Sequence, residues 1–115
     1  MIGEGTQRVI NAIVSALEDK KAIDVKVIDL EGRTSLADAF ILATGNSDVH
    51  MSTLVRVADE TLTKEGITPR IEGEYSTQWA LIDGGDVIVH IFGVKAREFY
   101  SLERIWKAVE AERQG

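Results

Sequence analysis

Residues 72–92, EGEYSTQWALIDGGDVIVHIF, decide the fold predicted for this chain. Two alternating apolar runs flank the sequence DGGD at 83–86, and a Gly-Gly pair supplies the positive φ angles that a tight hairpin turn requires. We therefore predict a β-hairpin whose turn is centred on Gly84-Gly85. That turn places Trp79 directly opposite His90 on the neighbouring strand.

The two faces of this hairpin differ in composition, because side chains alternate between faces along a strand. One face holds only apolar residues, which we expect to contact the core: Ala80, Ile82, Val87, Val89 and Ile91. The other face mixes aromatic, acidic, imidazole and aliphatic groups: Trp79, Leu81, Asp83, Asp86, Ile88, His90 and Phe92. Such a mixture is typical of a recognition surface. We expect this second face to be exposed; the alternative is that a second layer of helix covers it.

The rest of the chain supplies helices and three further strands. Apolar residues at the 3.6-residue period predict three helices, at 6–20, 47–66 and 95–111. Thr6 and Ser47 are the expected N-caps, and the last helix can divide near Ser101. The remaining predicted strands are 24–30, a central strand at 39–44 and an edge strand at 69–73. Together with the hairpin they predict an α/β fold with five strands in one domain, residues 1–115.

The composition restricts the class of protein. Thirteen Lys and Arg against nineteen Asp and Glu give a net charge of −6, and residues 71–94 contain acids but no Lys or Arg. This charge disfavours nucleic acid as the dominant contact, since phosphate binding needs cations, and it favours a basic partner. There is no cysteine, so disulfides and zinc-thiolate sites are excluded. No apolar run approaches the roughly 20 residues of a membrane span and the start lacks a signal pattern, so we expect a cytoplasmic protein without membrane contact.

Metal and catalytic sites are poorly supported by the spacing. Asp83, Asp86 and His90 share a strand face, but Asp86 and His90 are about 13 Å apart by strand rise, so one ion cannot bridge them. The residues GNS at 45–47 precede a helix N-terminus, where an anion can bind, but they lack the spacing of a dinucleotide fingerprint or a P-loop. No nucleophile pattern accompanies His50. We predict no metal, no cofactor and no enzyme activity.

Three blocks of sequence carry a resemblance to a known family: SLADAFILATG at 35–45, WALIDGGDVIVHIF at 79–92 and REFYSLERIW at 97–106. In combination they resemble the ribosomal silencing factor family, also called Iojap-like, over nearly the whole chain. The resemblance implies a small α/β domain with a mixed sheet and a nucleotidyltransferase-like topology, without catalysis. It also implies binding to ribosomal protein fourteen of the large subunit, so that the small subunit cannot join and translation falls when nutrients are scarce.

Carried over position by position, the resemblance implies partner contacts at Trp79, Asp83, Asp86, His90, Arg97, Tyr100 and Glu103. The chain departs from the family pattern in the second helix, at Val49, Val55 and Arg56. The role of that helix in partner contact or in a homodimer, which many relatives form, therefore stays open. Two other functions also stay open: a nucleotidyltransferase-like enzyme, and a large-subunit assembly factor without silencing activity.

Overall fold

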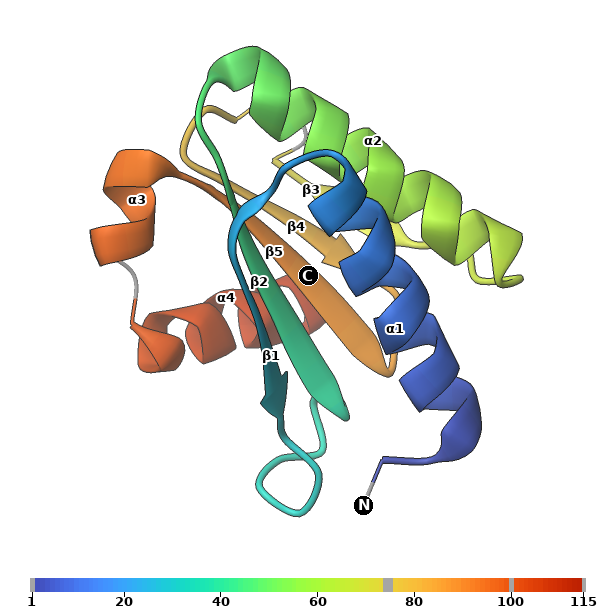
Figure 1. Cartoon of the computed structure of the whole chain (residues 1–115). Coiled ribbons are helices and arrows are strands. Elements are labelled where there is room, and N and C mark those ends of the chain that lie inside the picture. The colour runs from blue at the N-terminus through green and yellow to red at the C-terminus, as the bar shows by residue number, and fades with distance from the viewer. Residues whose placement is uncertain (1, 74–75, 100, 115) are drawn as a thin grey trace.

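A five-stranded sheet of order β1-β2-β5-β4-β3 forms the centre of the fold (Figure 1). The structure, a computed structural model, describes residues 2–73, 76–99 and 101–114. Strands β2 and β5 are parallel and the other neighbouring strands are antiparallel, so the sheet is mixed. The predicted α/β class and strand number are confirmed. The elements are α1 (Glu4–Asp19), β1 (Ile23–Asp29), β2 (Ala39–Gly45), α2 (Asp48–Lys64), β3 (Arg70–Glu72), β4 (Trp79–Asp83), β5 (Val87–Gly93), α3 (Val94–Phe99) and α4 (Leu102–Gln114).

Two of the three predictions about helix boundaries, the cap of α2 and the division of the last helix, agree with the structure. Ser47 caps α2, and its Oγ accepts a hydrogen bond from the His50 N–H at 3.1 Å. The predicted division near Ser101 is also present, between α3 and α4. The cap predicted at Thr6 is wrong, because α1 already begins at Glu4 and Gly3 precedes it without a side-chain cap. Among the described residues, no helix is long and apolar enough to cross a membrane.

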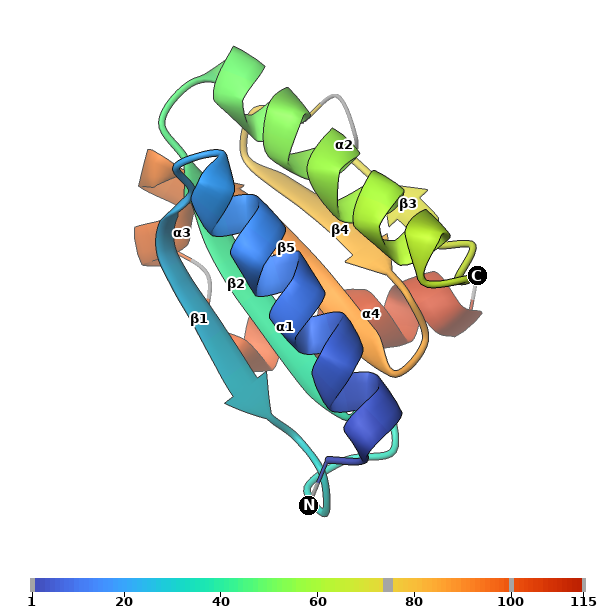
Figure 2. The same cartoon turned by 45° about the vertical axis from the view of Figure 1, so that its right-hand side comes forward.

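Helices cover both faces of the sheet, which divides the core into two layers. Figure 2 shows α1 and α2 in front of the sheet and α4 behind it. The front layer is closed by α1, whose buried residues are Val9, Ile10, Ile13 and Leu17. The rear layer contains the buried residues Leu30, Ala37, Phe40, Leu42, Leu81, Ile88, Phe92, Ala96, Ile105 and Val109. Every residue of β2 is buried, as predicted for a central strand covered on both faces.

The pairing of the hairpin strands differs from the prediction by two residues. Trp79 lies opposite Phe92, and His90 lies opposite Leu81. The predicted pair of Trp79 and His90 is therefore wrong. A shift of two residues preserves the alternation of side chains, so the predicted division of the hairpin into two faces holds.

The turn explains this difference. The Gly84 N–H donates to the Val87 carbonyl at 2.9 Å, so the ladder continues through Gly84 and the chain reverses at Gly85-Asp86. Gly85 takes a φ of +88°, whereas the φ of Gly84 is not positive. Gly84 packs closely for a different reason: a Cβ there would lie 2.9 Å from Leu62 Cδ2 of α2 and 3.0 Å from the Val87 carbonyl oxygen.

The second face of the hairpin is largely buried, so the expected exposed recognition surface is wrong there. Five of its residues lie beneath the rear helical layer: Leu81, Asp83, Ile88, His90 and Phe92. Trp79 is half-buried, and Asp86 in the turn is exposed. The physical reason is the amphipathic stripe of α4, where Ile105 and Val109 are buried against this face. Two polar side chains, Asp83 and His90, are consequently enclosed and need partners.

Candidate functional site

The structure separates the predicted site residues between the two ends of the sheet. Trp79 and Asp83 stand at opposite ends of β4, about 14 Å apart by strand rise. Asp86 belongs to the end with the hairpin turn, which we call the hairpin end (residues 83–86). Arg97 in α3 belongs to the other end, which we call the Trp79 end; there β2 and β5 finish and α3 leaves the sheet (Figure 1). The two ends have different chemistry.

Of the remaining predicted residues, the structure describes His90 and Glu103, which lie in different environments. His90 is fully buried in the middle of β5. Glu103 is exposed in the first turn of α4. Tyr100 lies outside the described residues.

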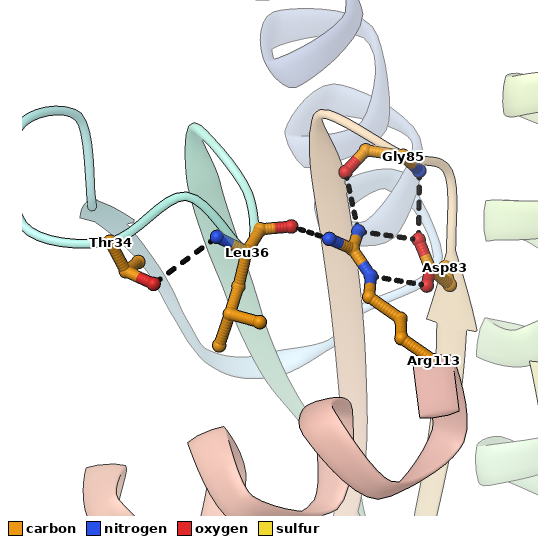
Figure 3. A network of polar contacts seen from close by, with 5 residues as sticks. All are labelled: Thr34, Leu36, Asp83, Gly85 and Arg113. Carbon is orange, nitrogen blue, oxygen red and sulfur yellow. Dashed lines mark hydrogen bonds and ion pairs between the residues drawn. The ribbon is translucent and has the colours of Figure 1, made fainter. Parts of the chain in front are cut away.

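At the hairpin end, one arginine of α4 closes a polar network around Asp83 (Figure 3). The Arg113 Nε donates to Asp83 Oδ2 and its Nη2 donates to Asp83 Oδ1, both at 3.2 Å. Asp83 Oδ1 also accepts from the Gly85 N–H at 2.8 Å. The same guanidinium donates to the Gly85 carbonyl at 2.8 Å and to the Leu36 carbonyl. Thr34 Oγ1 accepts from the Leu36 N–H at 3.1 Å, which helps to fix that carbonyl.

This network fastens the end of α4 to the hairpin. Asp83 is only 7% exposed, and Arg113 neutralises its charge, so Asp83 presents no carboxylate to a partner. The role of Arg113 has no local signal in the sequence, because Arg113 is thirty residues from Asp83 in the chain. Of the two acids predicted here, only Asp86 is exposed.

His90 is enclosed by aromatic rings in the rear layer. Its ring meets Phe40 edge-on at a centroid distance of 4.7 Å, and its Nδ1 accepts a hydrogen bond from the Trp79 Nε1–H at 3.2 Å. Burial lowers the pKa of His90 from 6.5 to about 3, against the opposing effect of the Asp83 charge. The ring is therefore neutral near pH 7. Because His90 is fully buried, it does not reach a partner in this conformation.

Arg97 is also used within the fold. Its Nη1 donates to Thr44 Oγ1 at 3.0 Å, and its Nη2 donates to the Asp24 carbonyl at 2.7 Å. The guanidinium carbon lies 5.8 Å from the centre of the Phe92 ring, a cation–π arrangement. Burial lowers the pKa of Arg97, opposed by the charge of Asp24. Arg97 thus ties α3 to the ends of β1 and β2, where Asp24 has a positive φ of 50° at an irregularity of the β1 ladder.

The Trp79 end exposes apolar side chains and also holds a half-buried tryptophan. The Trp79 ring stacks on Phe92 at 5.4 Å with an interplanar angle of 29°. Immediately after β5, Val94 is 53% exposed, and Val49 in the first turn of α2 is 77% exposed. Both valines follow parallel strands at their carboxyl ends, the edge at which α/β sheets usually bind their ligands. Sequence analysis missed Val94 as a surface residue, although its place directly after a strand-ending glycine is compatible with exposure.

The strands approach each other closely at this end. Gly93 N–H donates to the Gln78 carbonyl at 3.0 Å, beside Trp79. A Cβ on Gly93 would lie 2.5 Å from the Thr77 carbonyl oxygen, so only glycine fits there. The backbone around Trp79 is therefore held in place by β5. We take Trp79 together with Val94 and Val49, which follow the carboxyl ends of β5 and β2 at this end, as the candidate binding surface.

The glycine turn before α2 is an ordinary capped turn, as the sequence indicated. His50 Nδ1 accepts from the Asn46 N–H at 2.9 Å, and His50 Nε2 lies 2.8 Å from the Lys20 carbonyl oxygen. These bonds occupy the Asn46 amide and join α2 to the end of α1. In the part of the chain that the structure describes, no group of three or more His, Cys, Asp or Glu side chains could hold a metal ion.

Comparison with known proteins gives consistent matches. Residues 4–114 match the family model described as "Ribosomal silencing factor during starvation". A Bacillus subtilis protein named "Ribosomal silencing factor RsfS" is 34% identical over 99 residues, which cover 85% of this chain and 84% of that protein. A crystal structure from Chromobacterium violaceum has a TM-score of 0.81 at 33% identity, covering 88% of this chain and 85% of that one. A mouse protein named "Mitochondrial assembly of ribosomal large subunit protein 1" is 28% identical over 101 residues, 84% of this chain and 44% of that protein.

Proposed function

Because this chain belongs to the ribosomal silencing factor family, we propose that it binds the large ribosomal subunit and prevents the small subunit from joining. Translation is thereby repressed when nutrients are limited. The protein acts in the cytoplasm as a single domain, by occupying a surface. This mechanism requires no cofactor and no bond-breaking step.

The observation that carries the proposal is the half-buried Trp79 at the end of the sheet where Val94 is exposed. Tryptophan is enriched among the residues that dominate protein interfaces, and an exposed aliphatic side chain at the same end adds apolar surface. We propose that this end contacts ribosomal protein fourteen of the large subunit. Exposed Glu103 and Asp86, together with the net charge of −6, favour approach to a basic protein.

The buried members of the predicted set act differently in this proposal. Asp83 fastens the end of α4 through Arg113, away from this surface, and does not touch the partner. His90 and Arg97 support the surface through Trp79 and Phe92 rather than by touching the partner. Tyr100 remains a proposed contact from the family resemblance alone. A homodimer is not required, since one Trp79 end is sufficient to occupy a site.

The experiment compares two exposed valines on different parts of the surface. Val94→Lys places a cation at the Trp79 end, where a basic partner should repel it, while Val27→Lys on β1 makes the same change of charge elsewhere. We expect Val94→Lys to weaken binding to purified large subunits at least tenfold and Val27→Lys to leave it within about twofold. Equal affinities of the two variants would remove the Trp79 end from the interface.

A second function, assembly of the large subunit without silencing, is favoured by the name of the mouse relative. It uses the same binding surface but predicts a different outcome. An assembly factor would associate with immature large subunits and leave the joining of mature subunits unchanged. Sedimentation of mixed, purified subunits therefore separates the two functions.

A further inference from the structure

His90 is a polar residue whose position is not explained by packing alone. It is fully buried in a layer that is otherwise mostly apolar, between Phe40 and Phe92. A leucine at this position would fill the layer without burying a polar ring. Its two nitrogen atoms have different surroundings.

The hydrogen bond to Trp79 determines where the ring carries its proton. An indole Nε1–H only donates, so Nδ1 of His90, 3.2 Å away, must be the acceptor. In the neutral ring the proton then lies on Nε2. That Nε2 is buried and has no hydrogen-bond partner among the residues that the structure describes. Burying an unsatisfied donor costs stability. Nε2 therefore destabilises the fold, whereas Nδ1 holds Trp79.

Trp79 is held from two directions as a result. Its ring face stacks on Phe92 at 5.4 Å, and its N–H is fixed by His90. Phe92 in turn lies below the guanidinium of Arg97. A half-exposed indole restrained in this way loses little conformational entropy when a partner covers its free edge.

We infer that His90 is a positioning residue for partner binding: its Nδ1 orients the Trp79 indole in the conformation that a partner meets. This inference rests on the proposed function, because it assigns Trp79 to the binding surface. Direct contact between His90 and the partner is not part of it. The low pKa of His90 is consistent with this role, since it keeps Nδ1 unprotonated at physiological pH.

The test uses a matched pair of variants at one position. His90→Leu removes the acceptor and keeps an apolar side chain, whereas His90→Asn keeps an oxygen at about the place of Nδ1. We expect His90→Leu to weaken binding to purified large subunits about three- to tenfold, the range of one hydrogen bond, and His90→Asn to restore most of that loss. In a Trp79→Phe background, His90→Leu should have no further effect on binding.

A spectroscopic measurement tests the hydrogen bond without any partner. In ¹H–¹⁵N spectra the Trp79 indole N–H should shift and exchange faster in His90→Leu than in the wild type. The Trp106 indole, whose Nε1 has no partner among the described residues, should not move and serves as the internal reference. An unshifted Trp79 resonance would overturn the inference.

The binding outcomes separate failure of the inference from failure of the proposed function. If His90→Leu binds like the wild type while Trp79→Ala binds weakly, the function stands and the positioning role is wrong. Equal weakening by the leucine and asparagine variants, with equal losses of thermal stability, also overturns it in favour of a packing role. If the wild-type protein does not bind large subunits at all, both proposals are wrong.

Discussion

The pair Asp83 and Asp86 provides a sharp test, because two neighbouring carboxylates of one hairpin have different environments. Asp83→Asn removes the charge that receives two hydrogen bonds from Arg113, whereas Asp86→Asn changes an exposed side chain. Hydrogen bonds to charged groups contribute about 1.5–3 kcal/mol. The Arg113 side chain is 28% exposed and regains water, so we expect a loss near the lower end, about 2 kcal/mol for Asp83→Asn. Asp86→Asn should change stability by less than about 0.5 kcal/mol.

Thermal unfolding measures this difference directly. With an unfolding entropy of about 0.24 kcal/mol/K for a chain of 115 residues, 2 kcal/mol lowers Tm by about 8 °C. Below its Tm, Asp83→Asn should still bind the large subunit with wild-type affinity, because the wild-type Asp83 carboxylate faces Arg113 and not the partner. Arg113→Gln should show a similar loss of stability. If Asp83→Asn unfolds like the wild type but binds poorly, Asp83 is a contact residue and the reasoning from the ion pair is refuted.

Three further changes test other parts of the structure. Trp79→Ala should weaken binding to large subunits by about 2 kcal/mol or more while the domain stays folded; a collapse of Tm without a binding defect in the folded fraction would make Trp79 structural. Between pH 6.5 and about 3, His90 binds a proton in the unfolded state but not in the folded state. The free energy of unfolding of the wild type should therefore fall as the pH is lowered, by at most ~1.4 kcal/mol per pH unit relative to His90→Leu. If urea unfolding gives the same pH dependence for both proteins, the low pKa of His90 is contradicted. Gly93→Ala should destabilise the fold by about 1–3 kcal/mol through contact with the Thr77 carbonyl, whereas Gly3→Ala, which has open space, should cost less than 1 kcal/mol; equal Tm values for the two would show that Gly93 is not required.

Most elements of the fold could be predicted because they depend on local periodicity. The continuous apolar run 39–44 correctly indicated a central strand, and Ser47 correctly indicated the start of α2. These signals lie within single elements, so one sequence is enough to show them.

The errors concern contacts between residues distant in the chain. Gly84-Gly85 has the sequence of a turn centred on both glycines, but the ladder continues through Gly84, which lies against Leu62 of α2, and the turn begins one residue later. The burial of Asp83 depends on its ion pair with Arg113, which lies in the last turn of α4. The local sequence around Gly84 and Asp83 gives no sign of Leu62 or Arg113. The apolar stripe of the last helix did signal that some sheet face must be covered, and that signal should have outweighed the polar residues on the hairpin.

The most direct test of the central claim is sedimentation of purified small and large subunits mixed in the presence of this protein, without nucleotide. The proposed mechanism predicts that protein added before mixing lowers the peak of joined ribosomes, with saturation at a stoichiometric amount relative to large subunits. Protein added after joining should have much less effect, because the small subunit already covers its site. Trp79→Ala should be weaker in the same assay. If joined ribosomes form normally while the protein remains bound to the large subunit, the steric silencing mechanism is contradicted.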